Sequence, residues 1–173
     1  MELILLLTVI LGLGNTSLRD DGVGIYTARL LDRRMDNLAD VKEAELAGFE
    51  LLEALDGYER AIIIDSIQLE GVTPGTVFKL RPQDLKITPR LASFHDIDLV
   101  TALALGKRLG LDMPTDVEIY AVQAEDVLTL EEGCMPSVNK AIPGLVEEIA
   151  GEVSGTPYTR VSKRLDERSG RGA

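Results

Sequence analysis

The feature that most constrains the fold is the alternation of short apolar runs with amphipathic segments. The run from Leu5 to Leu13 is apolar apart from Thr8, and Ala61–Ile64 is apolar throughout. Between them, apolar residues recur at helical spacing as far as about Met35: Val23, Tyr26, Thr27, Leu30 and Leu31. Strands without polar alternation are typical of a sheet buried on both faces. This pattern predicts an α/β fold, a three-layer α/β/α sandwich.

The remaining segments extend the alternation. We predict helices over residues 46–55, 95–109 and 137–150, the last closed by Gly151, and strands over 76–80 and 116–123. Residues 82–89 and the acidic stretch 124–136 read as loops. Only ten residues, 66–75, separate Asp65 from the strand at Thr76. A parallel crossover needs about a dozen residues or more, so this strand should be antiparallel to the one before, and the sheet mixed.

The length of 173 residues suits one domain. We predict a single α/β domain over residues 1–151, followed by a polar tail over 152–173 that frays. The apolar N-terminal run is too short to span a membrane. It follows Glu2 instead of a basic region, so we interpret it as a strand and not as a signal peptide.

The charge limits the possible partners. The net charge is −11, with 29 acidic and 18 basic residues. Nucleic-acid binding requires clustered Lys and Arg, so neither nucleic acid nor an anionic membrane is an expected partner. Cys134 is the single cysteine, which excludes an intramolecular disulfide and fits a cytoplasmic location. The oligomeric state cannot be predicted from the sequence.

Three polar clusters fall where strands end or on nearby loops, and in such sheets ligands bind beyond the carboxyl ends of the strands. Asp20 and Asp21 precede a predicted helix, where one carboxylate can cap the helix while the other faces the crevice. Asp65 follows a buried strand, where it must be solvated, hydrogen-bonded to turn amides or bound to metal. His95 is the only histidine, and lone histidines are more often structural or exposed.

Taken together, Asp21, Asp65 and His95 offer two oxygen donors and one imidazole, a set that can bind a first-row divalent metal if the fold brings them together. The sequence has no HExxH motif. Two alternatives are weaker. Gly12–Ser17 nearly fits a dinucleotide-binding loop, but the neighbouring carboxylates would repel a pyrophosphate. Cys134 and His95 could form a thiol–imidazole pair only if they meet in space.

Five segments, in order along residues 1–150, resemble hydrogenase maturation proteases. Gly12–Gly24 (GLGNTSLRDDGVG) resembles the family signature G-x-G-N-x-L-x-x-D-D/E-G-x-G, with the leucine one position late. The other four segments are Ile62–Ser66 (IIIDS), Pro74–Val77 (PGTV), Ser93–Leu99 (SFHDIDL) and Glu131–Val138 (EEGCMPSV). The chain departs from the family at residues 43–46, where many members have D-G-G-T, and at Cys134, which is commonly aliphatic.

The resemblance implies a phosphorylase/hydrolase-like fold with five strands, one of them antiparallel. It also implies a metal-dependent endopeptidase of aspartic type, in which Asp21, Asp65 and His95 are the metal-contacting and catalytic residues. The implied partner is the large-subunit precursor of a [NiFe] hydrogenase, whose C-terminal extension is cleaved. The precursor would supply the nickel, and we expect no metal tightly bound to the free enzyme. Two alternatives stay open: a nickel-site chaperone that never cuts, and a general peptidase of the same fold.

Overall fold

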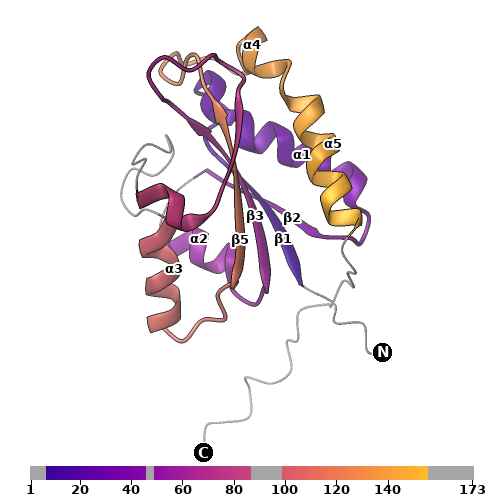
Figure 1. Cartoon of the computed structure of the whole chain (residues 1–173), viewed down its shortest axis with the longest axis vertical. Coiled ribbons are helices and arrows are strands. Elements are labelled where there is room, and N and C mark those ends of the chain that lie inside the picture. Colours follow the sequence, from indigo (N-terminus) through magenta and orange to yellow (C-terminus); the bar gives the residue numbers. More distant parts are fainter. Residues whose placement is uncertain (1–6, 46–48, 87–98, 156–173) are drawn as a thin grey trace, which may run out of the picture.

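The computed structural model describes residues 7–45, 49–86 and 99–155 (Figure 1). The strands are β1 Thr8–Leu13, β2 Asp40–Ala44, β3 Arg60–Ile67, β4 Val77–Leu80 and β5 Asp116–Gln123. The α-helices are α1 Val23–Met35, α2 Phe49–Leu55, α3 Leu99–Arg108, α4 Pro136–Asn139 and α5 Ile142–Ser154. Two 3-10 helices complete the chain order, η1 Arg19–Gly22 before α1 and η2 Pro82–Lys86 after β4. No helix among the described residues is both long and apolar enough to cross a membrane.

The five strands form one mixed sheet in the order β2-β1-β3-β5-β4. The first four run parallel, and β4 is antiparallel to β5. This confirms the mixed sheet and the antiparallel direction expected for residues 76–80. However, β4 pairs with β5 and not with the preceding β3. The reason is that β5 pairs with β3 over the whole length of both strands, from Arg60↔Asp116 to Ile67↔Gln123.

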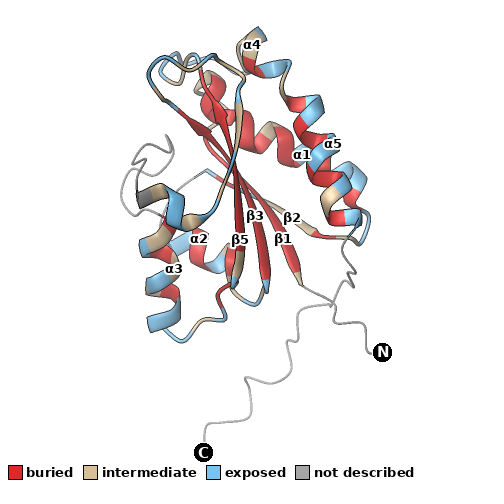
Figure 2. Ribbon diagram, viewed as in Figure 1, coloured by how far each residue is buried: buried red, intermediate tan, exposed pale blue. Residues whose placement is uncertain are grey.

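Helices cover both faces of the sheet, which confirms the predicted sandwich. Figure 1 shows α1 and α5 on one side and α2 and α3 on the other. Alternating side chains of the strands divide the core accordingly. Ile10, Ile62 and Ile64 pack with residues of α1 and α5, whereas Leu11, Ile63 and Ile119 pack with residues of α2 and α3. Both faces of the sheet are therefore covered, and the central strands β1 and β3 are buried along their whole length (Figure 2).

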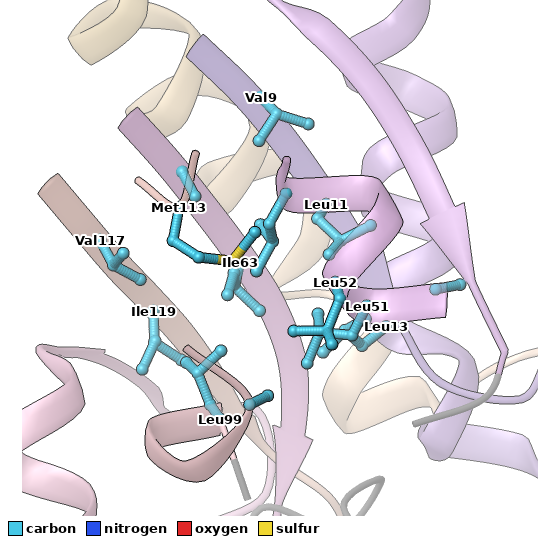
Figure 3. Packing of buried hydrophobic residues seen from close by; sticks show 14 of the residues in the cluster. Val9, Leu11, Leu13, Leu51, Leu52, Ile63, Leu99, Met113, Val117 and Ile119 are labelled. Atoms are coloured by element: carbon cyan, nitrogen blue, oxygen red, sulfur yellow. The ribbon is translucent and has the colours of Figure 1, made fainter. Parts of the chain in front are cut away.

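The face covered by α2 and α3 also contains a close contact between α3 and the connection that follows it. Met113, in the connection from α3 to β5, packs in the same cluster as Ile63 (Figure 3). A Cβ atom at Gly106 of α3 would lie 2.5 Å from the Met113 sulfur. A larger residue at this position would therefore require the Met113 side chain to move, so Gly106 allows α3 to pack closely on it.

Strand β2 was not predicted from its residues. Its sequence is DVKEA, and only Ala44 is buried. Charged side chains are typical of an edge strand, because they discourage pairing with other chains. Here Lys42 lies over the Tyr58 ring, 4.7 Å from its centroid, and Glu43 pairs with Arg29 at 2.9 Å. A strand that is polar on its exposed edge carries little of the hydrophobic signal on which the other strands were predicted.

Three predicted boundaries need correction. Strand β3 continues through Asp65 to Ile67, because these residues still pair with β5. The predicted helix 137–150 is two helices, α4 and α5, and the second does not end at Gly151. It runs to Ser154, because Val153 continues the buried face of Ile149. The predicted tail therefore begins inside α5, and its later part, 156–173, lies outside the described residues. The helix predicted from His95 is described from Leu99 on.

Candidate functional site

The candidate site lies at the carboxyl ends of β1 and β3. The last pair between these strands is Gly12↔Ile64, and β1 ends one residue later at Leu13. Strand β3 continues for three residues beyond this pair, Asp65–Ile67. The 3-10 helix η1, which carries Asp20 and Asp21, approaches β3 here through the contact between Asp21 and Ser66. The crossover from β1 thus brings a second carboxylate to the end of β3.

Asp21 is 8% exposed, and both of its carboxylate oxygens accept hydrogen bonds. The Asn15 backbone N–H donates to Oδ2 at 3.0 Å, and the Ser66 hydroxyl donates to Oδ1 at 3.3 Å. The first bond closes the turn that follows β1, and the second reaches across to β3. Asp21 is therefore held in place by the loop before it and by the neighbouring strand.

Asp65 is fully buried, and its Oδ1 accepts the Ser66 backbone N–H at 2.8 Å. Ser66 therefore contacts both carboxylates, Asp65 through its amide and Asp21 through its hydroxyl. Strand alternation places Asp65 on the face of Ile63 and Ile67, which α2 and α3 cover.

His95, the third predicted ligand, lies in 87–98, outside the described residues. Two members of the predicted set are thus hydrogen-bonded to the same residue, Ser66, and the position of the third stays a prediction. Within the described ranges, no group of three or more His, Cys, Asp and Glu side chains is arranged to hold a metal ion. Two of the three predicted ligands are present there, and their oxygen donors suit a divalent cation.

Glycines allow η1 to reach this position. Gly14 has φ +135°, and a Cβ on it would lie 1.8 Å from the Asp21 carbonyl oxygen. A Cβ on Gly24 would lie 2.2 Å from the Ile64 carbonyl oxygen and 2.4 Å from that of Leu13. The start of α1 thus packs directly on the ends of β1 and β3. The glycines that resembled a dinucleotide-binding loop serve the close approach of two backbones.

Asp20 has a role that sequence analysis missed. It is fully buried, and no side-chain cap was found for η1 or α1, so the expected helix cap is wrong. Its carboxylate instead accepts three backbone N–H groups from the distant loop after β5. The bonds come from Glu125 at 2.8 Å, Asp126 at 3.0 Å and Met135 at 2.6 Å. Adjacent acids in the sequence signalled only a helix start, because the partner amides lie more than a hundred residues away.

The loop after β5 is fastened to the region around η1 at further points. The Arg19 backbone N–H donates to the Glu131 carbonyl at 2.9 Å, and the two side chains form an ion pair. The Tyr26 hydroxyl accepts the Gly133 N–H at 2.9 Å and donates to the Thr16 carbonyl at 3.1 Å. These bonds hold residues 125–135 beside the segment that carries Asp21.

Cys134, in this same loop, does not behave as a nucleophile. Its side chain is half-buried and packs against the cluster on the α1 and α5 side. Burial, together with the nearby Asp20 carboxylate, raises the pKa of the thiol to about 12. A thiol with such a pKa is protonated at neutral pH, whereas the thiolate is the reactive form. Cys134 is therefore a packing residue, as a single cysteine usually is.

Comparison with known proteins matches this arrangement to one family. Residues 25–152 match the hydrogenase maturation protease family. The Hydrogenase 2 maturation protease of Escherichia coli K12 is 26% identical over 149 residues, covering 82% of this chain and 87% of the relative. Because the family match covers most of the chain, the chain belongs to the hydrogenase maturation protease family.

Solved structures agree on the fold. The [NiFe] hydrogenase maturation protease HybD from Thermococcus kodakarensis superposes with a TM-score of 0.66 at 25% identity, covering 85% of this chain and 99% of that one. The hydrogenase maturating endopeptidase HybD from E. coli superposes with a TM-score of 0.69 at 21% identity, over 86% of this chain and 93% of that one. At this identity the second comparison supports the fold alone.

Proposed function

We propose that this protein is the endopeptidase that removes the C-terminal extension from the nickel-loaded large-subunit precursor of a [NiFe] hydrogenase. Membership of a protease family supports peptide-bond cleavage, and the names of its relatives point to hydrogenase. The observation that carries the proposal is the pair of buried aspartates, Asp21 and Asp65, which share contacts with Ser66 at the carboxyl end of β3.

The nickel belongs to the substrate, where cysteines of the precursor hold it. Asp21, Asp65 and His95 would meet it as two oxygen donors and one imidazole nitrogen, which is a suitable set for a first-row metal. A metal at this point supplies Lewis acidity and a fixed position for the scissile peptide. This dependence would make cleavage specific without an extended peptide-binding groove, because an unloaded precursor does not complete the site.

The hydrolytic step requires a base for the attacking water. One of the two carboxylates would take a proton as the water oxygen bonds to the scissile carbonyl carbon, and would return it to the leaving amine. The side chains near Asp21 favour water over a protein nucleophile. Ser66 is fully buried, with its hydroxyl donated to Asp21, and the raised pKa of Cys134 keeps that thiol protonated. The protease would then be metal-dependent and of aspartic type, working in the cytoplasm.

The test is the intact mass of a nickel-loaded large-subunit precursor before and after incubation with the protein. We expect loss of a short C-terminal peptide, and no loss when nickel is omitted. Asp21→Asn, Asp65→Asn and His95→Gln should each slow cleavage by at least about 100-fold, because each removes a ligand or base. Asp36→Asn, an exposed acid after α1, is the matched control and should cleave normally.

Other outcomes would point elsewhere. A stable complex without mass loss would favour the nickel-site chaperone, and cleavage of unrelated peptides would favour a general peptidase. Full activity of all three site variants would rule out the proposed mechanism.

A further inference from the structure

The loop from Glu125 to Met135 exposes two leucines beside the candidate site. Leu128 is 86% exposed and Leu130 is 82% exposed, more than the other large exposed hydrophobic residues in the described part of the chain. Burying leucine side chains is favourable, so two exposed leucines on one loop can contribute to the binding of a partner. Single exposed apolar residues need no explanation, but two of them on one short loop that is bonded to Asp20 indicate an interaction surface.

These leucines are exposed on a loop that is held in place. The Asp126 carboxylate accepts the N–H groups of Leu128 at 2.9 Å and Thr129 at 3.0 Å. The buried Asp20 carboxylate fastens the loop at both ends, and the contact between Arg19 and Glu131 fastens it in between. A surface whose backbone is already ordered loses little entropy when a partner binds.

The same loop is strongly acidic. Glu125, Asp126, Glu131 and Glu132 lie in this stretch, which contains no Lys or Arg. Glu132 is exposed next to the leucines in sequence. Exposed leucines flanked in sequence by carboxylates complement a peptide that carries apolar and basic side chains, because opposite charges steer association and select the partner.

The loop is also hydrogen-bonded to the segment that carries Asp21. Asp20, which binds three of its amides, is the residue before Asp21. The loop leaves the carboxyl end of β5, the strand that pairs with Asp65–Ile67, at the top of Figure 1. A chain that reaches Asp21 and Asp65 from this side would therefore pass the leucines.

We infer that Leu128 and Leu130, with the exposed Glu132 that follows them in the same loop, form a docking surface for a segment of the substrate precursor that carries apolar and basic side chains. This inference rests on the proposed function, since it takes the precursor as the partner. The surface contributes to substrate binding and not to the chemical step. It would therefore affect KM, while Asp21 and Asp65 affect kcat.

The experiment uses the full chain and measures KM and kcat for cleavage of the nickel-loaded precursor by mass spectrometry. The combined Leu128→Ser and Leu130→Ser variant should raise KM by at least about tenfold with kcat unchanged, because apolar contact is lost in the bound state only. The combined Leu128→Met and Leu130→Met variant keeps the apolar surface and should retain the KM of the original protein.

Matched controls lie at the other end of the sheet. Leu109 is 57% exposed after α3, near the amino ends of the strands, and Leu109→Ser should leave KM unchanged. Glu132→Lys should raise KM at low salt, with a smaller effect at high salt because salt screens exposed charges. Glu59→Lys, an exposed acid before β3, is the control for this charge change.

The outcomes separate the two proposals. Normal KM in the serine variant, with cleavage intact, would overturn the docking surface and leave the protease function standing. Normal KM in Glu132→Lys at low salt would overturn the basic character of the docked segment. Absence of both cleavage and binding by the unaltered protein would overturn the proposed function and the docking surface together.

Discussion

At the scale of single residues, Gly14 allows Asp21 to reach Ser66, the residue that also bonds to Asp65. Gly14 adopts φ +135°, which L-residues with a side chain rarely adopt. Its missing Cβ also leaves the space that the Asp21 carbonyl occupies. Asp21 holds Asn15 and Ser66 at once, so displacing its backbone would break both contacts. The geometry of the candidate site thus depends on a residue that has no side chain.

We therefore expect Gly14→Ala to damage activity more than stability. The strained backbone should cost about 1–3 kcal/mol of unfolding free energy. Displacement of Asp21 by about an ångström should lower kcat/KM for precursor cleavage by about 100-fold. Urea unfolding and cleavage kinetics measure the two effects.

Gly57→Ala is the matched control for Gly14→Ala. Gly57 has φ +87°, but nothing lies within 4 Å of the Cβ that would be added. It should show a similar loss of stability with cleavage retained. Equal loss of activity in both variants would contradict a specific role for the contact between Gly14 and Asp21.

At the scale of elements, a network of charges ties α5 to the amino ends of β3 and β5. Arg60 of β3 pairs with Glu118 of β5 at 3.0 Å and also with Glu152 of α5. Lys79 pairs with Glu152 at 2.8 Å, and the Tyr120 hydroxyl donates to the same carboxylate at 2.7 Å. Burying the Arg60 guanidinium without partners would lower the stability of the fold. Glu118 and Glu152 therefore compensate its charge.

The pKa of Glu152 makes this network testable. Burial alone would raise the pKa of its carboxyl, but hydrogen bonds with Glu118, Lys79 and Tyr120 lower it from 4.5 to about 2. A lowered pKa in the folded state means that ionised Glu152 stabilises the fold above about pH 4.5. This contribution is lost as the pH falls toward 2.

Glu152→Gln should therefore be about 1–3 kcal/mol less stable than the unaltered protein at pH 7. The difference should shrink as the pH falls from 4.5 to about 2, because the original carboxyl becomes protonated there. Urea unfolding across this pH range gives the free energies. Glu148→Gln, an exposed acid on the same helix, should show no such trend. A difference that does not vary with pH would contradict the assigned role of the Glu152 charge.

At the scale of the whole molecule, a stabilising charge network and the candidate site lie at opposite ends of one sheet. The charge network surrounds the amino ends of β3 and β5, and the aspartates lie at the carboxyl end of β3. Between these ends the core is apolar on both faces. The last turn of α5 completes the charge network and one face of the core, since Val153 is 1% exposed and Glu152 pairs with Arg60.

The boundary of the domain follows from this arrangement. A chain ending at residue 151 should be less stable than one ending at residue 155 by about 3 kcal/mol or more, because it loses the buried Val153 and leaves Arg60 without Glu152. Urea unfolding of the two chains measures the difference. Equal unfolding midpoints would show that the domain is complete at Gly151, as the sequence first suggested.

The elements that the sequence predicted correctly are those whose apolar pattern is complete within a short run of neighbouring residues. Helix α1 and strand β5 were predicted with the bounds that the structure has, because their apolar patterns are strong and local. Strand β2 was missed because its charged residues obscure its strand pattern. The predicted end of α5 is wrong because glycine is typical just after a helix, whereas Val153 here continues the helical spacing past Gly151.

The sequence by itself determined the layered α/β class, the mixed sheet and the choice of Asp21 and Asp65 as candidate residues. These follow from hydrophobic periodicity, the length of one connection and the order of short motifs, which are all properties of neighbouring residues. Only the tertiary structure decided that the Ser66 hydroxyl donates to Asp21, that Asp20 holds a loop more than a hundred residues away, and that β4 pairs with β5. Such contacts join segments that are distant in the chain, and no local pattern encodes which distant amide or strand edge a residue will meet.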